Sequence, residues 1–434
     1  MNDTPSNFLQ RSLQRACDIR TEEVRVTLAS FLLVLTLMAA YYLLRPVRDA
    51  MASDWSDAEV SWLWTFTFFF SAIAVSVYGT AVSRVKFVRL VPSVYGFFAL
   101  SFVLFYLGTQ TLGDRTLLDK AFYVWISVFS LFHISVFWSF MADLYTRPQA
   151  IRLFGFIGAG ASVGGLIGPG IAAVLVQDIG TDQLLLIASV LITLTIPTIR
   201  YLQRLQLTAA HAEDAHAYTG AAIGGNPFAG FSEFMKSPYL LGIGVFILLY
   251  TSVSSFVYFE LKNILAEYDR ETRSQIWASM DLVVNSLTIA IAAFATGRIA
   301  RRMGLPFTLA CVPVLIGAGF MVLAAAPMVA IVIAIQIIRR AGNYAITRPA
   351  REMLFTAVDR ETRFKAKPVI DIVIYRGGDM LNAWAFTGLT QGLGLGLGAV
   401  ALVGAGICVA WAATGIFLGR YFHRIQTPDE AADS

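Results

Sequence analysis

Arginines inside long apolar stretches are the residues of this sequence best suited to chemistry. A guanidinium group binds a carboxylate or a phosphate through two parallel hydrogen bonds. An ionisable side chain in an apolar stretch costs about 2.5 to 3.5 kcal/mol on membrane-insertion scales, unless it is paired or faces a water-filled path. We therefore expect these residues to bind an anionic small molecule. The candidate binding residues are Arg45, Arg48, Arg339, Arg340, Asn343 and Arg376.

Acidic residues accompany these arginines in the same stretches. Asp281 and Asn285 are four residues apart and share one helix face, and Asp379 follows a pair of glycines. We expect the carboxylates to couple gating or to pair with the arginines between cycles. The alternative is permanent ion pairing that holds helices together, for example Arg376 with Asp371 or Asp379. The candidate coupling or gating residues are Asp49, Asp143, Asp281, Asp371 and Asp379.

The composition excludes an ordinary soluble enzyme. Of 434 residues, 57% are hydrophobic and 14% are charged, against roughly 45 to 50% and a quarter in soluble domains. The formal charge of +4 is too small and too dispersed for a nucleic-acid partner. The three cysteines and four histidines show no metal-ligand spacing, so we expect neither a metal site nor a cofactor.

Apolar segments of spanning length recur along the chain. A segment of about 20 residues crosses the hydrocarbon core of a bilayer, and only helices or closed barrels satisfy their backbone there. These segments are too long and too uniformly apolar for barrel strands, so we predict an all-α integral membrane protein with twelve transmembrane helices. The predicted spans are 27–50, 60–82, 88–108, 121–144, 153–176, 184–203, 239–260, 279–300, 306–326, 328–349, 369–391 and 396–420.

The placement of charge predicts the orientation in the membrane. Most Lys and Arg residues fall in segments that are cytoplasmic if both termini are inside. The acidic residues before the first span argue against a mitochondrial transit peptide. We expect a monomeric, multi-pass protein of the cell (inner) membrane, in contact with the lipid bilayer and with both termini cytoplasmic.

The spans divide into two sets of six, which we expect to be pseudo-symmetric halves. A shift of about 217 residues aligns the segment 41–46 with 258–263, and other short matches keep the same order. This is the pattern of transporters that rock one half against the other around a midplane site. The expected organisation is a cytoplasmic tail 1–26, a first half 27–204, a cytoplasmic linker 205–237, a second half 238–421 and a cytoplasmic tail 422–434.

Two glycine-containing motifs resemble those of the major facilitator superfamily. The segment 297–304 (GRIARRMG) resembles its loop motif between the second and third helices of a half, and 155–169 resembles its antiporter motif. The alternatives are loop charge for the first motif and generic small-residue packing for the second. The motif residues are Gly155, Gly164, Gly168, Pro169, Gly297, Arg301, Arg302 and Gly304.

The seventh predicted span has an unusually polar wall. Its polar residues are Tyr250, Ser252, Ser254, Ser255, Tyr258 and Glu260. By contrast, His133 is alone on the apolar fourth span, and we expect it to be packed or hydrogen-bonded rather than to relay protons.

A narrower resemblance connects the chain to the ATP/ADP translocase (nucleotide transporter) family. The segments 42–49 (YLLRPVRD), 137–143 (FWSFMAD) and 365–379 are similar to segments of that family, with Arg48 in place of a lysine and Asp143 in place of a glutamate. Gly378 or Asp379 stands where the family has a second lysine. The resemblance implies a twelve-helix facilitator fold and exchange of nucleotides, and the lost lysine leaves another phosphorylated or carboxylated anion open.

These patterns favour a secondary antiporter of organic anions, with nucleotides as leading candidates, that works by alternating access. The alternative is a proton-coupled facilitator-type exporter of small amphipathic compounds, with Asp281 or Asp143 as the proton carrier. We do not expect an enzyme, because no nucleophile and base pair or metal set is evident. The absence of a GxxxxGK[ST] sequence argues against ATP hydrolysis as the energy source.

Overall fold

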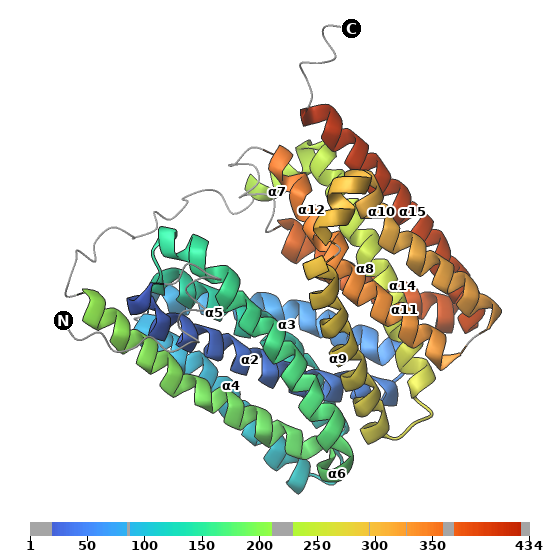
Figure 1. The fold of residues 1–434 in the computed structure, drawn as a ribbon. Coiled ribbons are helices and arrows are strands. Elements are labelled where there is room, and N and C mark those ends of the chain that lie inside the picture. The colour runs from blue at the N-terminus through green and yellow to red at the C-terminus, as the bar shows by residue number, and fades with distance from the viewer. Residues whose placement is uncertain are drawn as a thin grey trace, which may run out of the picture. The chain divides into compact units, whose positions relative to one another are not determined.

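The structure is a computed structural model that describes residues 20–84, 87–210, 229–294, 296–326, 328–358 and 369–426. Within these ranges every regular element is a helix (Figure 1). This confirms the predicted all-α fold. The long helices are α2 (Val24–Met51), α3 (Asp57–Arg84), α4 (Phe87–Thr111), α5 (Thr116–Leu144), α6 (Arg147–Ala210), α8 (Pro238–Leu265), α9 (Arg270–Phe294), α10 (Thr296–Ala325), α11 (Val329–Gly342), α14 (Tyr375–Thr387) and α15 (Leu397–Gln426).

Shorter helical segments connect or extend these helices. π-Helical turns extend two of the long helices, because η3 continues α11 and η6 continues α14. The short segments are η1 (Thr21–Glu23), η2 (Ala52–Asp54), α7 (Ala229–Lys236), η3 (Asn343–Thr347), α12 (Arg348–Leu354), η4 (Phe355–Ala357), η5 (Val369–Ile374) and η6 (Gly388–Gly392).

Where the structure describes them, the predicted spans lie on helical residues, with differences at the ends. The fifth and sixth spans share α6, which changes direction at Gly180 (φ 80°), and α10 changes direction at Gly304 (φ 76°). Glycine adopts such left-handed backbone angles without the steric penalty of a Cβ atom. Within the described ranges, eight helical segments are long and apolar enough to cross a membrane, and α6 counts as one of them. The chain is therefore a multi-pass membrane protein.

The chain folds into two compact units. Unit 1 comprises Met1–Met51, Phe69–Gly220 and Asp269–Leu282, and unit 2 comprises Ala52–Phe68, Ala221–Tyr268 and Val283–Ser434. Helices α3 and α9 each begin in one unit and end in the other. We call residues 52–68 and 269–282 the exchanged segments, because each belongs to one unit while the chain on both sides of it belongs to the other. They start at Ala52 and Asp269, which are separated by the same shift of about 217 residues that aligns the two predicted halves of the sequence.

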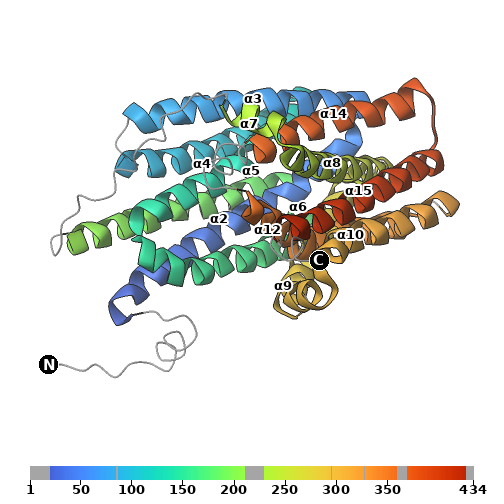
Figure 2. The same cartoon turned by 90° about the horizontal axis from the view of Figure 1, so that it is seen from above.

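In unit 1, α2 and α4 both pack along α6 (Figure 2). The contact with α2 is very close, because small residues of α6 face the backbone of α2. A Cβ atom on Gly160 would lie 2.6 Å from the carbonyl oxygen of Phe31, and one on Gly164 or Gly168 would collide with the carbonyl oxygen of Leu35 or Ala39.

These close contacts assign a packing role to part of the predicted antiporter motif. Gly164 and Gly168 are buried against α2, but Gly155 is exposed and has no atom within 4 Å of a Cβ position. Gly160, which is outside the motif, makes the contact instead. Pro169 lies within α6, and the break in this helix falls at Gly180.

In unit 2, α15 packs along α10 and α8, and α8 also contacts α14 and α11. The core between these helices is apolar and aromatic, with Phe246, Trp411 and Ile316 fully buried. The polar wall of α8 is therefore placed between α11, which carries Arg339 and Arg340, and α14, which carries Arg376 and Asp379.

Candidate functional site

In unit 1, two predicted arginines meet two predicted aspartates. Arg48 lies on α2 and donates from Nε to Oδ1 of Asp49 (3.0 Å). Arg45, one turn earlier, lies 3.6 Å from Asp49 Oδ2 and 3.6 Å from Asp281 Oδ1 of α9. Asp49 and Asp281 are both buried. The structure thus brings together the C-terminal end of α2 and the middle of α9.

The charges in this cluster balance. Two guanidinium groups face two carboxylates, and Arg48 also donates to Ser127 Oγ (3.3 Å) and lies over the ring of Tyr123 at 5.5 Å. Cations and carboxylates that neutralise each other stabilise helix packing more readily than they attract a further anion. For these four residues, the alternative reading of internal ion pairing fits the geometry.

We expect Asp49→Asn to destabilise the protein by about 3 kcal/mol, because it leaves two largely buried guanidinium groups short of a carboxylate. Thermal unfolding in detergent measures this as a lower Tm. The matched control is Asp178→Asn on the exposed side of α6, which should leave Tm within about 1 °C. Equal Tm values for the two variants would show that Asp49 does not hold this cluster.

In unit 2, Arg339 is a buried cation held by neutral groups. Its side chain on α11 is 5% exposed. Nε donates to Gln336 Oε1 (2.9 Å), and one terminal nitrogen donates to Ser254 Oγ (2.7 Å) and Tyr250 OH (3.4 Å). Among the described residues, no carboxylate forms an ion pair with Arg339.

The polar wall of α8 has two sets of partners. Tyr250 and Ser254 face Arg339. On another face of the same turn, Ser252 donates to Asn382 Oδ1 (2.8 Å), and Asn382 Nδ2 donates to Thr251 Oγ1 (3.1 Å). The first set belongs to the arginine site, and the second fastens α14 to α8.

Further predicted residues surround Arg339. Arg340 is also buried, and Arg376 of α14 lies 3.7 Å from Asp379 one turn later. The ring of Tyr250 lies 6.0 Å from that of Tyr375. Three predicted arginines and one predicted aspartate thus lie on α11 and α14, and Arg376 and Asp379 form an ion pair with each other. Asn343 begins the π-helical turn that follows α11 and is half-buried.

Other predicted residues lie away from these clusters or outside what the structure describes. Asp143 is exposed near the end of α5, and Arg302 is exposed in the first turns of α10. The side chains of Asp371 and Arg301 lie outside the described part of the structure, and of Gly297 only the helical backbone is described. Gly304 marks the break in α10.

His133 has the packed environment that we expected. It is buried on α5, its Nδ1 lies 3.0 Å from the carbonyl oxygen of Phe129 and its Nε2 lies 3.3 Å from the sulfur of Met38. The ring of Tyr41 stacks on it at 4.8 Å. In the described part of the chain, no three His, Cys, Asp or Glu side chains are grouped so that they could hold a metal ion.

The sequence places Glu260 only on the polar wall of α8, and the structure shows in addition that its carboxylate is fully buried. Its side chain on α8 is 0% exposed, and neither carboxylate oxygen has a hydrogen-bond partner among the described residues. An ionisable group in such a place is a functional candidate by default. The sequence signal was a glutamate in an otherwise apolar and aromatic run, Phe256–Leu261.

Comparison with known proteins decides the family. The sequence matches the family model of the Major Facilitator Superfamily over residues 30–356. The chain belongs to this superfamily. Its membership agrees with the predicted class, a membrane transporter.

Solved facilitator structures share the fold at low sequence identity. A bacterial homologue of the human lysosomal transporter Spinster, inward-facing and unoccupied, is 14% identical over 94% of this chain and 97% of that chain, with a TM-score of 0.58. The nucleoside transporter NupG is 11% identical over 92% and 99%, with a TM-score of 0.64. No curated protein sequence matches the chain. The narrower resemblance to ATP/ADP translocases has no support in these comparisons.

Proposed function

We propose that this facilitator is a secondary antiporter of organic anions that works by alternating access. The observation that carries the proposal is Arg339, a buried guanidinium whose partners are a glutamine, a serine and a tyrosine. Arg340 follows Arg339 directly on α11 and is also buried. The second half of the chain therefore provides the binding site in this proposal.

The physical basis is the cost of a buried charge. A cation removed from water without a counter-charge is unfavourable by several kcal/mol, even when neutral groups hydrogen-bond to it. A carboxylate or phosphate that enters the site supplies that counter-charge and accepts the remaining guanidinium hydrogens. The binding free energy of the anion thus includes relief of the cost of burying Arg339.

Nucleotides are the leading candidates within this class. The segments that resemble nucleotide translocases are one reason, and the fold shared with a nucleoside transporter is another. The third reason is aromatic: Tyr250 and Tyr375 lie beside Arg339, and the ring of Trp411 lies 5.6 Å from that of Tyr250. Aromatic rings next to cations suit a planar base joined to phosphate.

Ligand-dependent thermal unfolding of the purified protein tests the proposal. A ligand that binds only the folded state stabilises it by RT ln(1 + [L]/Kd), so Tm rises with the logarithm of the ligand concentration once that concentration exceeds Kd. We expect ADP and ATP to raise Tm and neutral adenosine to leave it unchanged, because the site is selected by charge. Equal stabilisation by adenosine and ADP would contradict an anion site and favour a nucleoside carrier.

Glu260 favours a second candidate function, proton-coupled export. A buried carboxyl group without a polar partner is the type of group that carries a proton in coupled transport. This function differs from solute exchange because a pH gradient drives it and no internal counter-substrate is needed.

For proton-coupled export, Glu260→Gln is expected to abolish the response of transport to an imposed pH gradient while the protein still folds, because glutamine is isosteric and cannot release a proton. Transport into proteoliposomes with and without the gradient measures this. The control is Glu267→Gln, because Glu267 is exposed and lies two residues after the end of α8. This variant should keep the response to the gradient. A gradient response that survives Glu260→Gln would exclude Glu260 as the carrier.

A further inference from the structure

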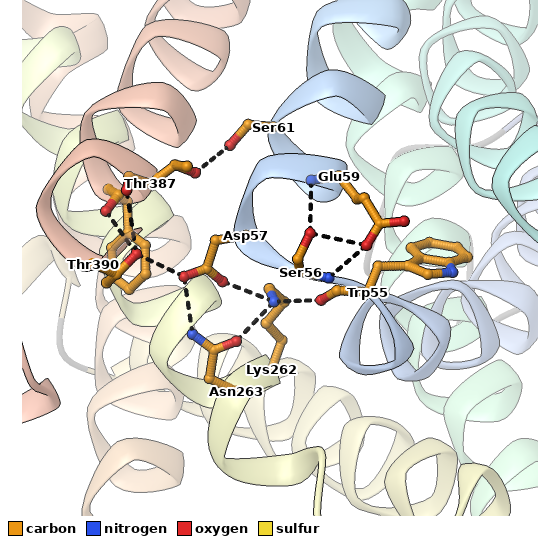
Figure 3. A network of polar contacts seen from close by, with 10 residues as sticks. Trp55, Ser56, Asp57, Glu59, Ser61, Lys262, Asn263, Thr387 and Thr390 are labelled. Carbon is orange, nitrogen blue, oxygen red and sulfur yellow. Dashed lines mark hydrogen bonds and ion pairs between the residues drawn. The ribbon is translucent and has the colours of Figure 1, made fainter. Parts of the chain in front are cut away.

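A buried lysine lies within a ring of oxygen atoms at the end of α8 (Figure 3). Lys262 is 1% exposed, and its Nζ lies 2.9 Å from Asp57 Oδ1 of α3. Nζ also donates to the carbonyl oxygen of Trp55 (2.9 Å) and to Asn263 Oδ1 (2.7 Å). The ammonium group thus has three oxygen partners, one from the first residue of α3 and one from Trp55, two residues before that helix.

The carboxylate of Asp57 completes the network. Its Oδ2 accepts hydrogen bonds from Thr390 Oγ1 of η6 (2.8 Å) and from Asn263 Nδ2 (3.4 Å). One turn along α3, the hydroxyls of Ser61 and Thr387 lie 2.8 Å apart. The start of α3 is therefore fastened to α8 and to the end of α14 by an ion pair and by hydroxyl and amide groups.

The position of this network along the chain suggests a role. Residues 52–68 belong to unit 2, but the residues before them in α2 and after them in α3 belong to unit 1. The network therefore attaches residues 52–68 to the rest of unit 2, although the chain on both sides of this segment belongs to unit 1. A permanent structural tie would need only apolar packing, which Trp62 and Trp384 already supply with ring centroids 5.2 Å apart.

The corresponding segment of the second half has its own polar contacts. Residues 269–282 at the start of α9 lie in unit 1 and are flanked by unit 2. Arg270 forms an ion pair with Asp119 of α5 (2.7 Å), and Gln275 donates to the carbonyl oxygen of Ala173 in α6 (3.1 Å). Both exchanged segments are thus held by ion pairs and hydrogen bonds. Hydrogen bonds to water can replace these contacts, so breaking them costs little net free energy where water has access.

Water has a place to enter beside the network. A cavity of about 540 Å³ is lined by both Asn263 and Thr390, and Glu267 also lines it. Lys262 and Asp57 would be left as buried charges if they separated in a dry core. The cavity removes that obstacle, because separated groups can be hydrated from it.

We propose that the Asp57–Lys262 network is a reversible latch that holds the start of α3 on unit 2 in this conformation and releases it in each transport cycle. Asp57 and Lys262 are then positioning residues: they act on the conformational step and do not touch the substrate. The inference rests on the proposed transport function only for its place in a cycle, since opening of the latch can be measured without a substrate.

Thiol labelling measures the opening directly. In a chain whose cysteines at 17, 311 and 408 are replaced by alanine, Ser61→Cys places a thiol at a position that is 0% exposed. We expect Asp57→Asn to raise its rate of reaction with a maleimide by at least about tenfold, because the latch loses its charge pair. The exchanged pair Asp57→Lys with Lys262→Asp should return the rate toward that of the parent.

The matched control is Ser255→Cys, equally buried on α8 but outside the network. Its labelling rate should not change with Asp57→Asn, so a rise at both positions would indicate general unfolding and overturn the latch. An unchanged rate at Ser61→Cys would overturn it as well. Neither result depends on what the protein transports.

A cross-link tests the place of the latch in the cycle with Asp57 and Lys262 intact. Oxidation of the pair Ser61→Cys and Thr387→Cys should form a disulfide, stop ADP exchange and allow recovery with dithiothreitol. Full exchange activity in the cross-linked protein would overturn the latch, and failure to form the disulfide would contradict the contact on which it rests. Absence of exchange in the reduced protein would instead count against the proposed function, and labelling would still decide the latch.

Discussion

Arg339→Gln is expected to lower the apparent affinity for the transported anion by at least about tenfold. A hydrogen bond to a charged group contributes about 1.5 to 3 kcal/mol, which corresponds to a factor of roughly 10 to 150 in Kd. Glutamine keeps part of the volume and a hydrogen-bond donor for Ser254 or Tyr250, so the change removes mainly the charge. Titration of Tm with ADP gives the two affinities side by side.

Two variants separate the charge of Arg339 from its shape and from general effects. Arg339→Lys keeps the charge but loses the planar fork, so we expect an intermediate affinity. Arg420→Gln removes an exposed arginine near the end of α15 and should bind like the parent. Unchanged affinity in Arg339→Gln would place the anion elsewhere.

Gly164→Ala is expected to lower Tm by at least about 5 °C, because there is no room for a methyl group between α6 and α2. Its Cβ would collide with the carbonyl oxygen of Leu35 and lie 3.0 Å from the backbone nitrogen of Ala39. Backbone atoms cannot rotate away as the end of a side chain can, so the helices would have to separate. Thermal unfolding of the purified protein measures the loss.

Gly170→Ala is the control for this prediction. It lies on the same helix, within two turns of Gly164, and no atom lies within 4 Å of its Cβ position. Alanine is also the better helix former, so Tm should stay the same or rise slightly. A similar loss in both variants would show that the glycines matter for α6 itself and not for its contact with α2.

The fold class could be read from the sequence because apolar runs of spanning length leave few alternatives. Helix ends were harder to predict, since polar residues can extend a helix past its apolar run. Helix α9 begins at Arg270, well before the predicted span, because Asp269 accepts hydrogen bonds from the backbone and the hydroxyl of Thr272 (2.8 and 2.7 Å). The same bonds lower the pKa of the Asp269 carboxyl.

The candidate site was only partly predictable. Sequence reasoning selected Arg45, Arg48 and Arg339 alike, since each is an arginine in an apolar span. Whether a carboxylate balances each one depends on tertiary contacts, and the pairing of Arg45 with Asp281 joins residues of the two sequence halves. The partnership of Asp57 with Lys262 could not be predicted for the same reason, because it also joins residues that are far apart in the sequence.

Counterflow in proteoliposomes tests the central claim, exchange of organic anions, most directly. Vesicles preloaded with unlabelled ATP are given labelled ADP outside, with no proton gradient imposed. The account predicts that label accumulates inside preloaded vesicles, does not accumulate in empty ones, and accumulates far less with Arg339→Gln. Equal uptake into preloaded and empty vesicles, or uptake that requires a pH gradient, would contradict anion exchange.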